Sequence, residues 1–250
     1  MSTEQTFAEV NGESLLLDCA GAAFWPAERT LVFADIHFEK GSSLARRGAL
    51  LPPYDTRTTL RRMTALIDAY LPARVIALGD SFHDVEAADR LDADEKAMLA
   101  KQVGRTDWIW IEGNHDPHPP AWLGGTVTSE LAVGGLVFRH EPTPIAQAGE
   151  IAGHLHPCAT VTRHGRSLRR RCFAADIHHM VMPAFGAYAG GLDVQDDAIS
   201  SLFADAFAAY MLGGRRVYAV AARGVPQLAR RKSTDESQPS VPAMSTANSP

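Results

Sequence analysis

The chain has 250 residues, 46% of them hydrophobic, and a formal net charge of −5 at pH 7 with a pI of about 6.0. A chain of this length can bury a self-sufficient core, and its acidic balance excludes a protein that coats duplex nucleic acid through its overall charge. No apolar run approaches the ~20 residues that span a bilayer, and the N-terminus lacks a secretory signal, so we expect a cytoplasmic protein with no membrane contact. The three cysteines are odd in number and widely spaced, and we expect reduced thiols.

Predicted strands and helices alternate through the first half of the chain. Asn11-Gly12 lies between two short β-like runs, a pattern typical of a hairpin. Further along, apolar runs predict buried strands, and apolar residues at helical spacing predict helices. The expected strands are 30–35, 73–80 and 108–111, and the expected helices are 55–70 and 92–103. This alternation indicates α/β layering with a parallel sheet.

The second half, after residue 125, consists of short β-like runs punctuated by Gly and Pro. A weak helical pattern covers 198–210, and 215–220 is expected to be the last strand. From about residue 225 the chain is rich in Ser, Pro and charge and poor in apolar residues, a composition typical of disorder. We therefore expect a single domain over residues 1–224 and a disordered tail over 225–250.

The predicted strands end on side chains that can bind metals. In chain order these are Asp35, His37, Asp80, His83, Asn114, His115, Asp116, His140, His154 and His156. Each short motif alone has an ordinary explanation, such as a turn or a hydrogen-bonded histidine. In an open α/β sheet, however, ligands bind outside the carboxyl ends of the strands. Five segments that end in this way predict one shared site.

The donor types limit the chemistry of that site. Mixed carboxylate and imidazole ligands suit first-row divalent metals such as Mn, Fe, Co or Zn, and the lack of thiolates disfavours a structural zinc. The donors exceed the needs of one tetrahedral ion but fit two ions that share a bridge. Two metals about 3.5–4 Å apart can clamp the attacking and leaving oxygens of a phosphoryl displacement, with a hydroxide between them as the nucleophile.

The ordered motifs resemble those of the calcineurin-like metallophosphoesterase superfamily. They are "DIH" (35–37), "GDSFH" (79–83), "GNHD" (113–116), "RH" (139–140) and "GHLH" (153–156). The resemblance spans roughly residues 30–195. It implies an α/β fold in which a layered β-sandwich carries flanking helices, with the metal site at the C-terminal ends of the strands.

The resemblance also implies a role for each residue. One metal would take Asp35, His37, Asp80 and His156, and the other would take Asp80, Asn114, His140 and His154. Asp80 would thus bridge the two ions. His115 would act beside the leaving-group oxygen as a general acid or transition-state stabiliser, and Asp116 would orient His115. His83 departs from the aspartate variant of its motif and is assigned to substrate contact.

A narrower resemblance comes from "FEKGSSLARRGALLPPYDTRTTL" (38–60) and "MPAFGAYAGGLDV" (182–194). Both stretches resemble the bacterial ligase-associated DNA-damage-response phosphoesterases. That family implies a manganese-dependent phosphodiesterase and endonuclease that cuts single-stranded DNA, in functional association with an ATP-dependent DNA ligase and a helicase-like protein. Within these stretches, Tyr54 could stack a base and Lys40 could neutralise a phosphate, although a packed tyrosine and a solvated lysine are the commoner outcomes.

Two basic clusters bear on the substrate. They are Arg46, Arg47, Arg57, Arg61 and Arg62, and the run 163–171. Such clusters are commonly solvated faces, but the second is dense enough to suggest a phosphate-facing surface. The alternative to a DNA-cleaving enzyme is a small-molecule phosphoesterase that acts on a nucleotide or cyclic nucleotide, because this superfamily reuses one centre for many substrates. A third possibility, a scaffold without activity, is disfavoured by the full set of donors.

Overall fold

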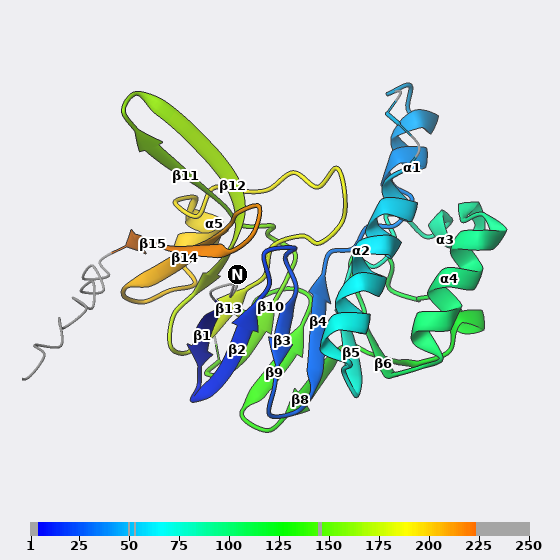
Figure 1. Cartoon of the computed structure of the whole chain (residues 1–250), viewed down its shortest axis with the longest axis horizontal. Helices are drawn as coiled ribbons and strands as arrows, with labels where there is room; N and C mark the ends of the chain where they lie inside the picture. The colour runs from blue at the N-terminus through cyan, green and yellow to red at the C-terminus, as the bar shows by residue number, and fades with distance from the viewer. Residues whose placement is uncertain (1–4, 50, 53, 145–146, 224–250) are drawn as a thin grey trace, which may run out of the picture.

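The structure is a computed structural model that describes residues 5–49, 51–52, 54–144 and 147–223. Two mixed β-sheets pack face to face, and helices cover the outer face of the first sheet (Figure 1). The expected layered β-sandwich with flanking helices is therefore confirmed. The tail predicted over 225–250 lies outside the described residues, and the single-domain assignment stays a prediction.

The first sheet has seven strands. In spatial order they are β1 (Thr6–Val10), β2 (Glu13–Leu17), β3 (Ala23–Trp25), β4 (Thr30–Ala34), β5 (Arg74–Leu78), β6 (Asp107–Ile111) and β7 (Thr126–Thr128). The predicted hairpin joins β1 to β2, and both Asn11 and Gly12 have positive φ. The strands from β4 to β7 are parallel, as the alternation with helices predicted, whereas β1 to β3 extend the sheet in antiparallel fashion.

The second sheet has eight strands. They are β8 (Glu130–Val133), β9 (Leu136–Arg139), β10 (Glu150–Ala152), β11 (Cys158–Arg163), β12 (Arg166–Ala175), β13 (His179–Val181), β14 (Phe207–Leu212) and β15 (Val217–Arg223). The helical expectation for 198–210 is wrong over its last part, which forms β14. The burial of Phe207, Ala209 and Met211 follows the period of two of a strand, and this alternation outweighs the helical propensity of the alanines.

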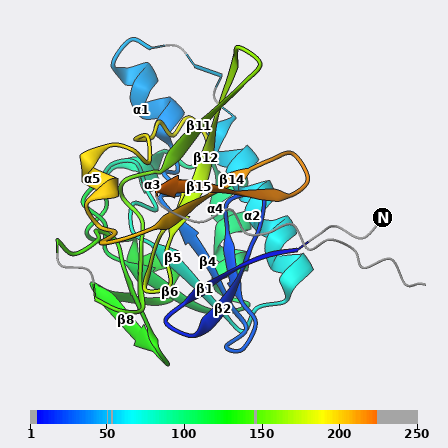
Figure 2. The ribbon, with the colours of Figure 1, turned by 90° about the vertical axis from the view of Figure 1, so that its left-hand side faces the viewer.

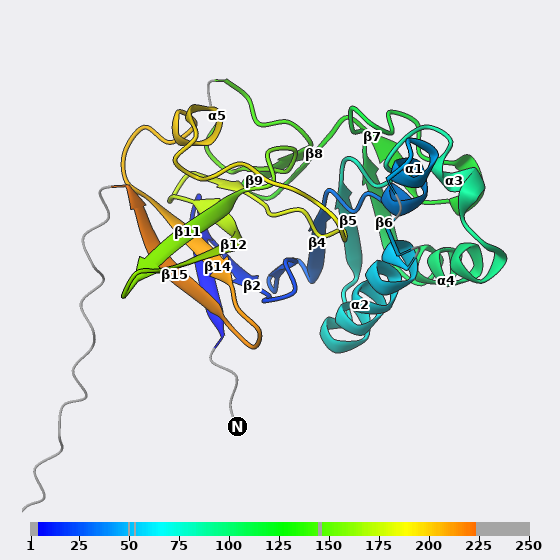
Figure 3. The same cartoon turned by 90° about the horizontal axis from the view of Figure 1, so that it is seen from above.

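The helices flank the first sheet, apart from α5. They are α1 (Lys40–Arg46), α2 (Asp55–Tyr70), α3 (Ala87–Arg90), α4 (Ala93–Val103) and α5 (Asp197–Ser200), with a 3-10 turn, η1, at Ala121–Leu123. The helix predicted over 55–70 has those bounds. Asp92 and Glu95 form a capping box at the start of α4, which explains why the acidic run there begins a helix. Seen from above, α2 and α4 lie together on one side of the first sheet (Figure 3).

The central strands are buried on both faces. Val32, Ile76 and Ile109 pack against Phe138 and Ile151 of the second sheet. The opposite face of the same strands packs against α2 and α4. Two-sided burial explains why these strands read as continuous apolar runs in the sequence. None of the described helices is long and apolar enough to cross a membrane.

Candidate metal centre

The structure brings the polar strand ends of both sheets together. Asp35 and His37 follow β4, Asp80 follows β5, Asn114 follows β6, His140 follows β9, and His154 and His156 follow β10. Parallel strands of each sheet end at one edge, and the sandwich places the two edges side by side. The predicted convergence of distant segments is therefore found in the fold, with two groups of side chains that could each hold a metal ion.

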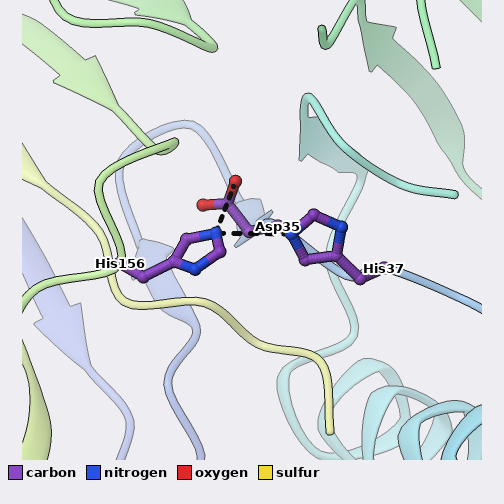
Figure 4. Close-up of side chains that lie close together, drawn as sticks. All are labelled: Asp35, His37 and His156. Atoms are coloured by element: carbon purple, nitrogen blue, oxygen red, sulfur yellow. Dashed lines mark hydrogen bonds and ion pairs between the residues drawn. The ribbon is translucent and has the colours of Figure 1, made fainter. Parts of the chain in front are cut away.

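The first group consists of Asp35, His37 and His156 (Figure 4). The Nε2 atoms of His37 and His156 are 3.3 Å apart, and Nε2 of His156 is 3.2 Å from Oδ1 of Asp35. Figure 4 shows the two rings pointing their nitrogens toward each other beside the carboxylate. Asp35 and His37 are buried, and the backbone N–H of His154 donates to the Asp35 carboxylate at 3.0 Å.

The second group consists of Asp80, His140 and His154, with Asn114 beside it. Nε2 of His140 lies 2.9 Å from Oδ1 of Asn114, 3.2 Å from Nδ1 of His154 and 3.4 Å from Oδ1 of Asp80. The other ring nitrogen of His140, Nδ1, is 3.3 Å from the carbonyl oxygen of Leu78. A carbonyl oxygen can only accept a hydrogen bond, so Nδ1 carries the proton of the ring. The lone pair of Nε2 therefore faces the other atoms that could bind a metal ion.

Asp80 lies between the two groups. Its Oδ1 faces His140 of the second group, while its Oδ2 is 3.9 Å from Nε2 of His37 in the first. The backbone N–H of His115 donates to Oδ1 at 2.9 Å and fixes the carboxylate. One carboxylate with an oxygen toward each group has the geometry that a bridging ligand requires.

The backbone at the site adopts left-handed conformations that side chains rarely take. Positive φ values occur at Asp35 (49°), His37 (47°), Asp80 (45°), His154 (66°) and His156 (48°). Each such residue costs of order 1–3 kcal/mol, and strained residues of this kind cluster at functional sites. The strain is local to the strand ends and turns the side chains of both sheets toward the same space.

Two glycines leave room for the site. Gly79 has φ +70°, and a Cβ there would lie 2.2 Å from Nδ1 of His140. At Gly113 a Cβ would lie 2.1 Å from the backbone nitrogen of Asp80 and 2.4 Å from its Oδ1. Both glycines in the "GD" and "GN" motifs are thus required by close approach of the ligand side chains.

The donor set fits divalent cations. Coordination bonds of about 2.0–2.2 Å place neighbouring ligand atoms about 2.8–3.6 Å apart, and the five separations given above for the two groups fall in that range. Burial of Asp35 and Asp80 without a cation would be costly, because isolated buried charges lose their hydration. The lone pair of His140 also faces the acceptor-only carboxylate of Asp80, an arrangement that a shared cation stabilises.

Comparisons with known proteins agree with this geometry. No protein-family model matches the chain, and no curated protein matches it. Among solved structures, the chain is similar to nuclease MPE from Pseudomonas putida, with 29% sequence identity and a TM-score of 0.71 over 87% of this chain and 100% of that one. The resemblance to the calcineurin-like metallophosphoesterases is thus confirmed, and the chain is a metallophosphoesterase-like hydrolase. A weaker likeness to YfcE, a phosphoesterase from E. coli, has 14% identity and a TM-score of 0.40 over 77% of this chain and 98% of that one, and it supports no conclusion.

In this metallophosphoesterase His115 stands at the rim of the site. Its side chain is 41% exposed, and its Nε2 lies 3.9 Å from Oδ2 of Asp80. Nδ1 of His115 is 2.8 Å from the carbonyl oxygen of His83, so Nδ1 carries a proton and Nε2 faces the site. The ring of His83 stacks on that of His115 with centroids 5.2 Å apart, and burial, followed by the charge of Lys40, lowers the pKa of His83 to about 4.

Asp116 has no hydrogen bond to His115 within the described part of the chain, so its role in orienting His115 stays a prediction. Its Oδ2 accepts a hydrogen bond from the backbone N–H of Phe82 at 3.0 Å, and Oδ1 has no hydrogen-bond partner among the described residues. Burial, with a smaller contribution from the charge of Asp80, raises the pKa of Asp116 to about 8. The carboxyl group ties the loop after β6 to the loop after β5, and the group in contact with Nδ1 of His115 is the carbonyl of His83.

The remaining candidates for substrate contact differ in their exposure and in their partners within the protein. Lys40 begins α1 and is half-buried; burial lowers its pKa, and the charges of Asp35 and Asp80 oppose that shift. The Tyr54 side chain is 67% exposed before α2, so it is free of the packing role that was its commoner expectation. In the first basic cluster several arginines have partners within the protein: Arg46 pairs with Glu86, Arg57 pairs with Asp92, and Arg62 donates to carbonyl oxygens.

Two half-buried arginines that the sequence analysis gave no specific role hold the loop beside Asp35. Arg171 donates to the carbonyl oxygens of Ala184 at 2.6 Å and Gly186 at 3.1 Å, and Arg62 donates to that of Phe185 at 3.0 Å. The N–H of Gly186 in turn donates to the carbonyl of Asp35. The only sequence signal for these arginines was their position within basic runs. Such a run does not show whether an arginine binds a loop of the protein or faces the solvent.

Proposed function

We propose that this chain is a dimetal phosphodiesterase that cleaves DNA, preferably single-stranded. The observation that carries the proposal is the arrangement of Asp80 between two groups of N and O donors drawn from both sheets. The similarity to a nuclease of Pseudomonas putida supports a nucleic acid as the substrate. The narrower sequence resemblance supports a role in DNA repair beside a DNA ligase and a helicase-like protein, in the cytoplasm.

The proposed ligands follow the two groups. Asp35, His37, Asp80 and His156 would hold one ion, and Asp80, Asn114, His140 and His154 would hold the other. A pair of divalent cations, with Mn²⁺ the first choice, supplies an activated water and neutralises charge on the phosphoryl oxygens. The protein contributes the fixed spacing, because backbone strain and buried hydrogen bonds hold each donor before any ion binds.

His115 is proposed to protonate the leaving oxygen. The carbonyl of His83 accepts a hydrogen bond from Nδ1–H of His115. The proton for the leaving oxygen would therefore come from Nε2, which faces the space beside Asp80. An exposed ring at the rim can approach a leaving group that extends out of the site, which is what a polymeric substrate requires. Lys40 and His83 are proposed to contact the phosphate, and Tyr54 a base.

One observation favours the alternative, a small-molecule phosphoesterase. A cavity of about 360 Å³ beside Asn114 and His140 is lined by Glu112, Glu130 and Glu141, with Arg139 as its single cation. These acids would repel a polyanion that leaves the site in this direction. A nucleic acid would therefore have to leave on the side of α1 and the loop at 182–194.

A matrix of metals and substrates tests the proposal. The purified full chain is assayed with Mn²⁺, Fe²⁺, Co²⁺ or Zn²⁺ on an aryl phosphodiester, an aryl phosphomonoester, a cyclic nucleotide and a single-stranded oligonucleotide. We expect cleavage of the diester and the oligonucleotide, strongest with Mn²⁺, and none with Asp80→Ala. Glu86→Gln, an exposed acid outside both groups, is the matched control and should retain activity. Cleavage of the monoester or the cyclic nucleotide alone would establish the alternative.

A further inference from the structure

The basic run at 163–171 divides into two sets, because it lies in a β-hairpin. Strands β11 and β12 pair with Thr160 opposite Arg169, Val161 opposite Leu168 and Arg163 opposite Arg166. Residues opposite each other share a face, and faces alternate along a strand. Arg163, Arg166 and Arg170 therefore lie on one face with Val161 and Leu168, whereas Arg169 and Arg171 lie on the other.

The side chains on the face with Arg169 form hydrogen bonds with the rest of the protein. Arg169 donates to the carbonyl of Gly191 at 2.7 Å, and the hydroxyl of Thr160 donates to Asp193 at 3.2 Å. With the bonds of Arg171 to residues 184–186, these contacts join the hairpin to the loop that borders the metal centre. This face supports the loop, and the guanidinium groups of Arg169 and Arg171 on it already donate to backbone carbonyl oxygens.

The opposite face forms one wall of a groove. The hairpin stands beside the β14–β15 pair, as Figures 1 and 2 both show. The groove between them has a volume of about 450 Å³ and is lined by Val161, Leu168, Arg170, Met211, Leu212, Gly213, Gly214, Tyr218 and Val220. Its walls are apolar, yet Leu168 and Tyr218 remain 49% and 47% exposed. Exposed apolar surface of this kind marks a binding site more often than a solvent face.

The charge of the groove is of one sign. Arg170 lines it, Arg163 and Arg166 continue the same face toward the tip of the hairpin, and the guanidinium of Arg216 lies 4.6 Å from the centre of the Tyr218 ring. None of the described residues that line the groove is acidic. Apolar walls with an aromatic ring and a row of guanidinium groups form the surface on which unpaired bases stack while their phosphates are neutralised.

We propose that this groove is a second binding site for single-stranded nucleic acid, separate from the metal centre. The bases would lie against Leu168 and Tyr218, and the phosphates would follow Arg170, Arg166 and Arg163. The charge complementarity selects this occupant over an apolar helix or a second copy of the chain, which would leave three guanidinium groups without counter-charges. The proposal rests on the proposed function for the chemistry of the ligand, but the site lies on the face of the hairpin that points away from the loop of the metal centre.

The test compares a long and a short substrate on the full-length, Mn²⁺-loaded protein. The long substrate is a single-stranded oligonucleotide of roughly 20 nucleotides, and the short ones are a dinucleotide and an aryl phosphodiester. Arg170→Glu and Arg166→Glu should raise the KM for the long substrate. They should also reduce the slope of log binding constant against log salt concentration by about 0.7 per lost phosphate contact. Tyr218→Ser should raise the KM for the long substrate by roughly 5- to 150-fold, the range for loss of one stacked base. Lys101→Glu, at an exposed lysine in the last turn of α4 outside both basic clusters, is the matched charge-reversal control and should have no effect.

Crosslinking locates the contact independently of turnover. An oligonucleotide that carries 5-bromodeoxyuridine is irradiated with the full-length Asp80→Ala protein, and the crosslinked peptide is identified by mass spectrometry. We expect the peptide that contains Tyr218, with the crosslink lost in Arg170→Glu. A crosslink confined to the metal centre, or an unchanged KM for the long substrate in every folded variant, would overturn the proposal. So would a dimer in light scattering that Leu168→Glu dissociates, because a second copy would then occupy the groove.

The two proposals fail in different ways. If the wild-type protein and all groove variants cleave the long substrate equally, the groove has no such role and the proposed function stands. If the wild-type protein binds and crosslinks through Tyr218 but does not cleave the oligonucleotide, the second site stands and the DNA-cleaving function falls.

Discussion

Replacement of His115 by alanine separates proton donation from metal binding. The ring is held from outside the ligand set, since its Nδ1 donates to the carbonyl of His83. Its hydrogen bond to a proposed ligand, Asp80, comes from the backbone N–H, which alanine keeps, whereas its Nε2 lies 3.9 Å from the Asp80 carboxylate. We therefore expect His115→Ala to bind the same number of metal ions as the wild-type protein and to fold normally, because the side chain is 41% exposed.

The size of the effect depends on the leaving group. A general acid contributes typically 10²- to 10⁴-fold, which is about 3–5 kcal/mol of transition-state stabilisation. The full loss should appear with an oligonucleotide, whose alkoxide leaving group needs a proton. A nitrophenolate leaves without one, so hydrolysis of an aryl phosphodiester should fall by roughly tenfold or less. The two substrates are compared as kcat at saturating Mn²⁺, with metal content measured on the same samples.

His118→Ala is the matched control, because it removes a nearby exposed imidazole that lies outside both metal groups. Equal losses on the oligonucleotide and the aryl diester would show that His115 acts on something common to both reactions, such as the phosphoryl oxygens. No loss on either substrate, with metal retained, would remove His115 from the mechanism.

Three further predictions concern metal binding and stability. Mn²⁺ at about 100 times its Kd should raise the free energy of unfolding by ~2.7 kcal/mol per site, seen as a thermal shift of about 5–10 °C per site that Asp80→Ala reduces. Asp92→Ala removes the capping box of α4 and should cost about 0.5–2 kcal/mol in urea unfolding, with kcat unchanged. Burial of Asp84 opposes the hydrogen bonds from Arg90 and Ser43, but those bonds prevail and lower its pKa to about 2. Its contribution to stability is present above about pH 4 and is lost as pH falls through about 2, so Asp84→Asn should flatten the dependence of the unfolding midpoint on pH in that window.

The sequence predicted the site because the donors lie at the ends of recognisable strands. Apolar runs before Asp35, Asp80 and Asn114 are buried on both faces, and their parallel pairing follows from the helices between them. A shared edge is then a consequence of topology. The His140 and His154 segments belong to another sheet. The strand-end argument grouped them with the other segments by assuming one open sheet, whereas in the structure they reach the site because the two sheets pack face to face.

Other features depend on contacts that sequence patterns do not encode. The α1 helix was not expected, because it begins at a left-handed Glu39 with no side-chain cap and contains Gly41 and two serines. Gly41 is required there, since a Cβ would meet the Asp55 carboxylate at 2.5 Å. Likewise, composition alone groups all arginines at 163–171 together. Only the register of β11 and β12 separates those that hold the loop from those that line the groove.

The core of the protein stabilises the fold, whereas the residues of the site destabilise it. Five left-handed residues and two buried carboxylates at one edge of the sandwich all oppose folding, and together they amount to several kcal/mol. A domain has a net free energy of unfolding of only about 5–15 kcal/mol. The conformation of this edge therefore depends on the two apolar clusters behind it, one between the sheets and one between β4 to β6 and the helices. Cations would relieve the electrostatic part of that cost and leave the backbone strain in place. The apo protein should therefore keep its core and loosen first at the strand ends, where hydrogen exchange of the amides of Asp35, Asp80 and His154 would be faster without metal than with it.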